Sequence, residues 1–310
     1  MDKSSDYRIP LPTTHRANFL AYLTLAAGIC TVGFSAIFVR WAGAPGTVTS
    51  FYRMAIAALL LTWPFLRGVR SRKNAPRLGV RTAVLGGLIF SGDLALWSTG
   101  VVLSGATNPT LLANTAPVWV GLGALIFFRE RLSAKFWLGL VLAMSGAMLI
   151  LGLDALSATT LGLGTLLGLI AAIFYGSYFL ITQRGRENLD SLSYTWLSTL
   201  SASLALLVLS VLLGHPLTGY TTFSWLNFLA LGIVVQVFGW LAINYAQGYL
   251  PASIVAPSML AQPMVTAILA VLLLGETLSL WQALGGVTVL SGVYIVHRSR
   301  HRTPRDQETS

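Results

Sequence analysis

Asp93 is the residue of this sequence that most clearly suggests a chemical role, because it is the one carboxylate inside a long apolar run, residues 82–103. Arg53 lies inside the preceding run, 47–66, at an expected depth that differs by only about one helical turn. A charge in apolar surroundings needs a partner or access to water. The two residues therefore predict either an ion pair that clamps two helices or a site for a substrate group or a coupled proton. Arg40, at the end of the first apolar run, is expected to extend to water instead.

Polar and aromatic side chains share one face in two stretches of predicted helix. Gln236, Trp240 and Asn244 follow at a spacing of four, which aligns them along one side of an α-helix. Asp93 and Trp97 have the same spacing. Such stripes predict the wall of a cavity that binds a small solute; the alternative is hydrogen bonding between neighbouring helices.

Prolines interrupt the apolar runs 107–128 and 251–274. A proline removes a backbone donor, frees a carbonyl group and bends a helix. Such bends could bind a ligand at a cavity, and bends that serve packing alone are equally expected. The polar residues near these prolines are Asn108, Asn114, Ser258 and Gln262.

Tyr175 and Tyr178 lie about one helical turn apart, so their rings could stack on a substrate or pack in the core. With them the predicted substrate site is complete. Its members are Asp93, Trp97, Asn108, Asn114, Tyr175, Tyr178, Gln236, Trp240, Asn244 and Gln262.

Glu130 and Glu276 occupy equivalent turns, each followed by Leu and Ser at the same spacing. A carboxylate near the start of a helix is stabilised by the positive end of that helix. We expect both to cap the helix that follows rather than to take part in coupling.

Enzyme motifs are missing from the sequence. It has no Gly-x4-Gly-Lys-Ser/Thr loop for ATP and no His-Glu-x-x-His motif, and its four histidines lie in predicted tails or loops. We therefore expect no catalytic residues, no metal and no cofactor, and no enzymatic activity. An intramembrane enzyme acting on lipid would need a paired acid and base, which the runs do not supply.

The composition predicts a polytopic α-helical membrane protein. Hydrophobic residues make up 55% of the 310 residues, charged residues only 10%, and the mean hydropathy is +0.73. A soluble domain averages about 25% charged residues, so this chain could not cover a water-facing surface. The net charge of +10 fits basic loops beside a bilayer better than a nucleic-acid partner. A single cysteine, Cys30, excludes an internal disulfide.

The apolar runs predict ten transmembrane helices, since about 20 apolar residues cross a bilayer. Lys and Arg gather in the two tails and in alternate loops, and an odd number of helices would break that alternation. Both termini are therefore expected in the cytoplasm, and residues 154–160 on the opposite side of the membrane. The predicted helices span 17–41, 47–66, 82–103, 107–128, 133–153, 161–184, 191–213, 223–249, 251–274 and 278–297.

The two halves of the chain resemble each other. At an offset of 146 residues, 85–150 aligns on 231–296 without a gap, and Pro117 meets Pro263. Each half contains five helices, and because five is odd the second half enters the membrane from the opposite side. Such an inverted repeat is a recurring device of secondary transporters, with the substrate near the midplane between the repeats.

Several motifs resemble those of the EamA family of the drug/metabolite transporter superfamily, over residues 17–297. They are Phe38-Val39-Arg40-Trp41, Arg53 with Ala57, Gly92-Asp93-Leu94, Asn108, Pro117, Glu130-x-Leu-x4-Trp-x-Gly and Gly275-Glu276-x-Leu. The resemblance implies ten helices, residence in a bacterial inner membrane with residues 154–160 in the periplasm, and export of small metabolites. It divides the chain into a tail (1–16), a first repeat (17–153), a linker (154–160), a second repeat (161–297) and a basic tail (298–310).

We therefore expect a secondary transporter that exports small metabolites, above all amino acids including aromatic ones, by alternating access. The few intramembrane charges favour a neutral or zwitterionic solute. The alternatives are an uncoupled facilitator and an exporter of other metabolites or drugs. Proton coupling through Arg53 and Asp93 and the oligomeric state stay open.

Overall fold

The computed structural model of the protein describes residues 15–69, 76–105, 107–151, 162–274 and 279–300. Within these ranges the regular secondary structure is entirely helical, and ten helical segments are long and apolar enough to cross a membrane. The predicted number of spans is therefore confirmed. Glu276, the linker 154–160 and most of both tails lie outside the described residues.

Five spans form the first half of the chain and five form the second. In order, spans 1–5 are α1 (His15–Val32) with α2 (Ser35–Trp41), α3 (Gly46–Val69), α4 (Arg77–Ser104), α5 (Thr107–Ala113) with α6 (Ala116–Phe127), and α7 (Ala134–Leu151). Spans 6–10 are α9 (Leu163–Arg186), α10 (Ser191–Leu212), α11 (Thr222–Ala230) with η1 (Leu231–Trp240) and α12 (Leu241–Ala246), α13 (Ala252–Ser258) with η2 (Met259–Ala261) and α14 (Gln262–Leu274), and α15 (Leu280–Arg300).

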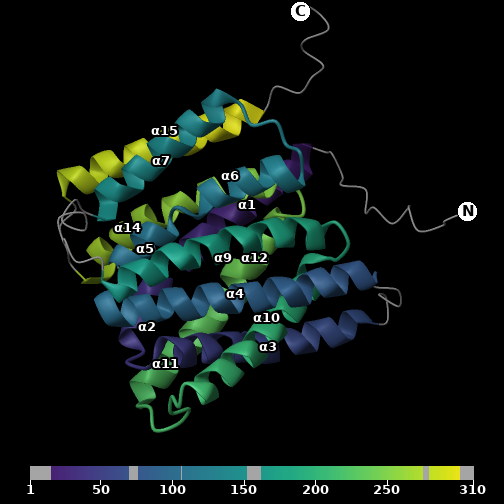
Figure 1. The fold of residues 1–310 in the computed structure, drawn as a ribbon, viewed down its shortest axis with the longest axis vertical. Helices are drawn as coiled ribbons and strands as arrows, with labels where there is room; N and C mark the ends of the chain where they lie inside the picture. The colour runs from purple at the N-terminus through teal and green to yellow at the C-terminus, as the bar shows by residue number, and fades with distance from the viewer. Residues whose placement is uncertain (1–14, 70–75, 106, 152–161, 275–278, 301–310) are drawn as a thin grey trace, which may run out of the picture.

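The spans lie side by side in a bundle, and their long axes run the same way across Figure 1. The start of α1, the end of α3, the start of α4 and the end of α15 lie at one end of this bundle, which we name the terminal end (Figure 1). The end of α7 and the start of α15 lie at the other, which we name the distal end (Figure 1). The distribution of Lys and Arg predicts that the terminal end faces the cytoplasm.

Four spans, 1, 4, 8 and 9, depart from a continuous α-helix. Span 4 breaks between α5 and α6, so that Pro117 opens α6, and span 9 breaks at η2, so that Pro263 opens α14. Proline is accepted in a first helical turn, where its missing N–H has no partner to lose. The sequence did not indicate the break of span 1 between α1 and α2, nor that Leu231–Trp240 in span 8 winds as a π-helix.

Spans 5 and 10 form a closely packed pair at one edge of the bundle (Figure 1). A side chain added at Gly139 would place its Cβ 2.8 Å from the carbonyl oxygen of Gly292, and one at Gly146 would come within 2.7 Å of that of Gly285. These glycines therefore let the two backbones touch. They serve the contact of span 5 with span 10 within one chain. The sequence alone was compatible either with this contact or with a contact between two copies of the protein.

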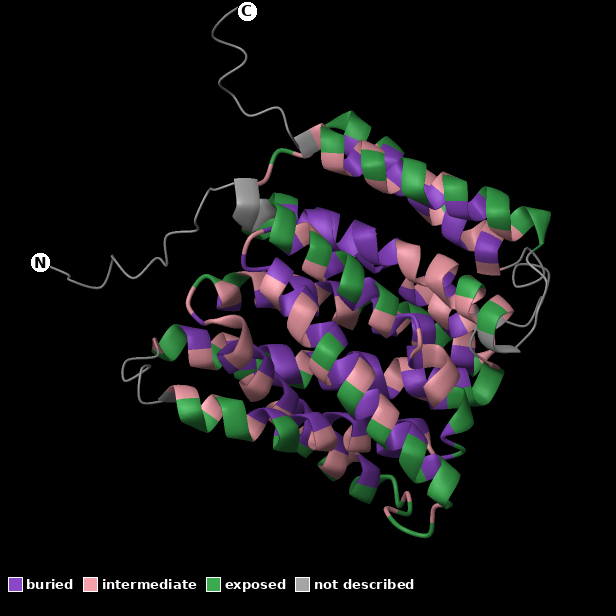
Figure 2. Cartoon of the chain, turned by 180° about the vertical axis from the view of Figure 1, so that it is seen from behind, coloured by how far each residue is buried: buried purple, intermediate pink, exposed green. Residues whose placement is uncertain are grey.

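Figure 2 shows exposed residues on the outer faces of the bundle and buried residues toward its interior. Many of the exposed residues are large and apolar. Leu59, Phe127 and Leu212 are 74%, 75% and 77% exposed. Exposure of this extent in one chain suits contact with lipid tails rather than water. The interior holds the polar residues whose partners are described next.

Candidate functional site

A cavity of about 360 Å³ lies between the two halves of the protein. Spans 1–5 contribute one part of its wall and spans 6, 8, 9 and 10 the other. Six of the ten predicted substrate residues border it, together with Arg53: Asp93, Trp97, Asn114, Tyr175, Trp240 and Gln262. The repeat thus places residues far apart in the chain around one space.

Arg53 and Asp93 both border the cavity, and both are almost fully buried. The Nε atom of Arg53 donates to Oε1 of Gln236 at 3.0 Å, and its Nη1 donates to the hydroxyl of Ser35 at 3.2 Å. Within the described part of the chain, no ion pair or hydrogen bond joins Arg53 to Asp93. Arg53 instead bonds neutral partners from spans 1 and 8, so these two described side chains do not form the direct ion pair, one of the two predicted alternatives.

Gln236 lies behind the cavity wall instead of in it. Its side chain accepts from Arg53, and its Nε2 donates to the hydroxyl of Thr199 on α10 at 3.5 Å. Trp240, on the same π-helix, does border the cavity. The amide of Gln236 therefore contacts the guanidinium rather than the open space.

Aromatic rings form one side of the cavity. Trp97 is half-buried, and its Nε1 donates to the hydroxyl of Thr110 on α5 at 3.2 Å. The ring centroid of Trp240 lies 4.6 Å from that of Phe90 and 5.9 Å from that of Tyr175. These contacts hold the rings in fixed orientations, as a stacking surface for an apolar side chain requires.

Tyr178 and Asn244 lie in the core behind this aromatic surface. Tyr178 stacks on Phe90 with centroids 4.3 Å apart, and its hydroxyl donates to Oδ1 of Asn244 at 3.4 Å. Nδ2 of Asn244 donates to the hydroxyl of Thr195 at 2.9 Å. Neither residue borders the cavity, and neither does Asn108 at the start of α5.

Three buried nitrogen atoms on cavity-lining residues have no hydrogen-bond partner among the described residues. They are Nδ2 of Asn114, Nε2 of Gln262 and Nε1 of Trp240. Asn114 and Gln262 stand at the breaks of spans 4 and 9. Since buried donors are nearly always bonded in folded proteins, unpartnered ones mark a place where acceptors are expected from elsewhere.

Sequence reasoning missed several lining residues, of which Phe90, Thr110 and Gln282 are examples. Phe90 had a usable signal, because the 146-residue offset pairs it with Gln236. Thr110 and Gln282 had none, since isolated polar residues near the ends of apolar runs are common.

The cavity extends toward the distal end. Arg40 at the end of α2, Leu151 at the end of α7 and Gln282 at the start of α15 all border it. Arg40 was expected to extend to water, and the structure places it at this rim of the cavity.

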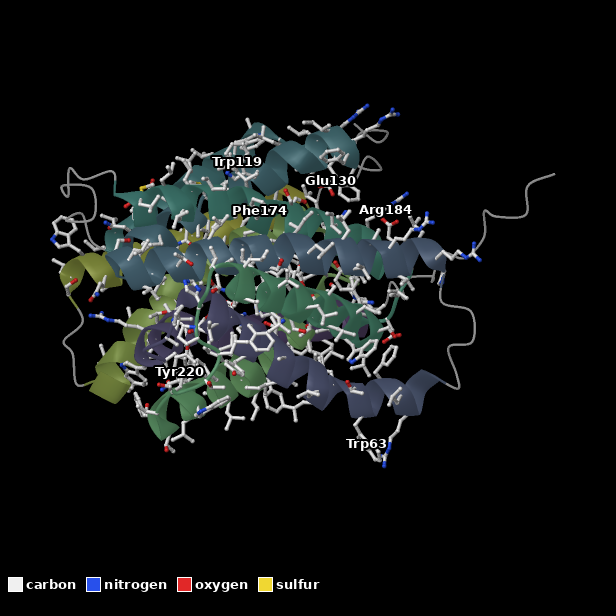
Figure 3. The ribbon with its side chains drawn as sticks, turned by 60° about the horizontal axis from the view of Figure 1, so that its bottom comes forward. Trp63, Trp119, Glu130, Phe174, Arg184 and Tyr220 are labelled. Atoms are coloured by element: carbon white, nitrogen blue, oxygen red, sulfur yellow. The ribbon has the colours of Figure 1, made fainter. Side chains whose placement is uncertain are left out.

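Polar contacts between the halves occupy the terminal end, where Figure 3 shows Glu130 near Arg184. Oε2 of Glu130 accepts from the hydroxyl of Ser253 at 2.7 Å, and Oε1 accepts from Nε2 of Gln183 at 3.5 Å. Oε1 of Gln183 accepts from the backbone N–H of Ala252 at 2.6 Å. Glu130 thus contacts the start of α13, in the opposite half, while Ser133 caps its own following helix. We name Glu130, Gln183, Ala252 and Ser253 the terminal cluster.

Ten candidate membrane spans around a cavity between the two halves define a polytopic membrane protein. The sequence model of the EamA-like transporter family matches this chain twice, over residues 19–152 and 162–298. The chain belongs to that family, and the double match agrees with two repeats of five spans.

Curated relatives cover nearly the whole chain. An "Uncharacterized transporter YdfC" of Bacillus subtilis is 25% identical over 87% of this chain and 88% of its own length. An "Uncharacterized transporter" of Archaeoglobus fulgidus is 27% identical over 86% of this chain and 92% of its own. A solved structure titled only "Crystal structure of protein" superposes with a TM-score of 0.71 over 93% of this chain and 99% of its own, at 16% identity. That likeness supports the fold alone.

Proposed function

We propose that this transporter exports small zwitterionic metabolites, in particular amino acids with large or aromatic side chains, by alternating access between its two repeats. The observation that carries the proposal is the cavity itself: both repeats line it, it extends to the distal end, and polar contacts between the repeats occupy the other end. This arrangement is what one state of an alternating-access cycle requires.

The size and lining of the cavity support the substrate class. Its volume of about 360 Å³ lies at the lower end of the range for small-molecule sites, about 300–1,000 Å³. Trp97, Tyr175 and Trp240 supply an apolar surface, and the amides of Asn114 and Gln262 supply donors. An amino acid presents both an apolar side chain and polar groups, so it matches both parts of the wall.

The predicted orientation indicates which side of the membrane the cavity faces in this state. If the terminal end faces the cytoplasm, the cavity opens to the outside, and the next step of the cycle must separate the terminal cluster. Asp93 is the candidate for proton coupling, because it is a titratable carboxyl that borders the cavity. An uncoupled facilitator with the same fold is the alternative.

Transport into liposomes tests this function. Purified full-length protein is reconstituted, and uptake of labelled phenylalanine, tryptophan, leucine and alanine is followed with and without an imposed proton gradient, against empty liposomes. We expect saturable uptake of the bulky amino acids. Uptake that the gradient does not change would favour the facilitator, and absence of uptake for every amino acid would contradict the proposed substrate class.

A further inference from the structure

Two side chains that can carry opposite charges, Arg53 and Asp93, border the same cavity. Arg53 is 3% exposed and Asp93 is 6% exposed. Among the described residues, neither bonds the other, and Asp93 accepts no hydrogen bond at all. An uncompensated charge inside a bilayer is unfavourable, so a ligand that supplies both opposite charges would stabilise both side chains.

Within the described ranges, only neutral side chains bond the guanidinium of Arg53, so its charge can still pair with a carboxylate of a ligand. Its Nε and Nη1 donate to Gln236 and Ser35, both of which are neutral. Its second amino group, Nη2, makes no hydrogen bond with the part of the chain that the structure describes. Thr199 anchors the amide of Gln236 in turn. A carboxylate on the ligand is the partner that such a planar fork binds best.

Asp93 offers the complementary charge from another element. It projects from α4, whereas Arg53 projects from α3. Trp97 lies four residues from Asp93 on the same helix and borders the same cavity. A ligand that reaches both charges therefore also lies beside the aromatic surface.

We propose that Asp93 and Arg53 are the two poles of a site for an α-amino acid: the carboxylate of Asp93 binds the ammonium group, and the guanidinium of Arg53 binds the carboxylate. Gln236 and Ser35 are positioning residues that act through Arg53. The proposal rests on the transport function proposed above and adds a requirement to it. A substrate must carry both charged groups, because a cation alone would leave Arg53 without a counter-charge and an anion alone would leave Asp93 without one.

Three ligands with the same ring separate the two poles. L-phenylalanine carries both charges, phenethylamine lacks the carboxylate and 3-phenylpropionate lacks the ammonium group. Each competes with uptake of labelled phenylalanine into liposomes that contain the wild-type protein. We expect each single-charge analogue to require about 10- to 150-fold more for half-inhibition, the range that follows from losing a hydrogen bond to a charged group.

The outcomes of this competition are distinct. Inhibition by phenethylamine equal to that by phenylalanine would overturn the role of Arg53, and equal inhibition by 3-phenylpropionate would overturn that of Asp93. Either result would leave amino-acid transport standing. If no amino acid is taken up, both this proposal and the proposed function fail.

Gln236→Glu tests the positioning role. The new carboxylate would lie within hydrogen-bonding distance of Arg53 and form an ion pair with its guanidinium. Because this pair competes with the carboxylate of the ligand, the KM for phenylalanine should rise about 10- to 150-fold. Inhibition by phenethylamine should not weaken, because that ligand does not use Arg53. Equal losses for both ligands would indicate general damage and contradict the positioning role.

Ser35→Ala and Ser258→Ala form a matched pair for the same question. Ser35 bonds Arg53, whereas Ser258 bonds His297 and a backbone carbonyl away from the cavity. We expect a rise in KM that is confined to carboxylate-bearing ligands for Ser35→Ala and no change in ligand preference for Ser258→Ala. Unchanged preference in both would remove Ser35 from the proposal.

Discussion

Trp97 and Trp240 both border the cavity, yet their surroundings predict different results when they are shortened. Trp97 is half-buried with one hydrogen bond, so Trp97→Ala should mainly remove contact with substrate. Losing about 1–3 kcal/mol of contact corresponds to a loss of about 5- to 150-fold in apparent affinity for tryptophan and much less for alanine. Uptake kinetics for the two amino acids measure this; equal losses would indicate packing damage instead.

Trp240 is 2% exposed and packs on Phe90, Tyr175, Tyr178 and Phe179. Trp240→Ala should therefore also destabilise the fold, by about 3–5 kcal/mol, as removal of a large core side chain does. Thermal unfolding in detergent checks this, with Trp63→Ala as control because Trp63 is 63% exposed on the outer surface. Similar unfolding temperatures for the two variants would contradict the core role of Trp240.

Much of the site could be predicted from residue type, and the part that could not has a physical cause. A charge or an indole in an apolar run is conspicuous, so Asp93, Trp97 and Trp240 stood out. The direction in which each side chain points could not be predicted as well, because a spacing of four aligns residues only along an α-helix of 3.6 residues per turn. Leu231–Trp240 winds more widely, so Gln236, Trp240 and Asn244 contact Arg53, the cavity and Tyr178 respectively.

Among the elements, the start of α13 carries the contact that must separate if the terminal end is to open. Glu130→Gln removes the charge that Ser253 and Gln183 share, which weakens the closed arrangement. Each 1.4 kcal/mol lost shifts the balance toward the open state about tenfold. A single cysteine at position 114, on a Cys30→Ala background, should then react faster with an impermeant maleimide in inside-out vesicles.

The control for this prediction is Glu187→Gln. Glu187 lies four residues after Gln183, the partner of Glu130, and pairs with Arg184 at 2.8 Å, but both of these side chains are about half exposed. Exposed pairs contribute little, so the labelling rate should stay unchanged. The terminal cluster would not be a closure if Glu130→Gln behaved like Glu187→Gln.

The pairing of α7 with α15 depends on the absence of side chains at particular positions. A Cβ at Gly285 would lie 2.7 Å from the carbonyl oxygen of Gly146, whereas the nearest atom to one at Gly286 is the sulfur of Met264 at 3.3 Å. Gly285→Ala should therefore force the helices apart and lower both unfolding temperature and folded yield, and Gly286→Ala should change little. Comparable values for the two variants would show that the close approach is not needed.

At the scale of the whole molecule, the spans were predictable because the cost of burying charge in lipid is large and general. Prolines indicated the breaks of spans 4 and 9, whereas the break of span 1 and the π-helix of span 8 had no signal in the order of residues. The orientation in the membrane stays a prediction from the distribution of Lys and Arg.

Impermeant labelling of intact cells tests that orientation. On a Cys30→Ala background, Thr218→Cys, in the exposed loop between α10 and α11, should react from outside, and Glu187→Cys, between α9 and α10, should not. The expected result follows from the positive-inside distribution of basic residues. Labelling at 187 but not at 218 would show that the protein has the opposite orientation. The cavity would then face the cytoplasm.

The π-helix of span 8 has no counterpart in span 3, although the repeat aligns 231–240 with 85–94 without a gap. No residue is inserted between the aligned segments 231–240 and 85–94, so the two segments differ in conformation and not in length. If the proposed transport cycle exchanges the conformations of the two repeats, we expect the wide winding to pass from span 8 to span 3. Amide hydrogen exchange would then report which end of the protein is open. We expect the π-helical segment to exchange faster than its α-helical equivalent: 231–240 in the state described here, and 85–94 when the other end is open.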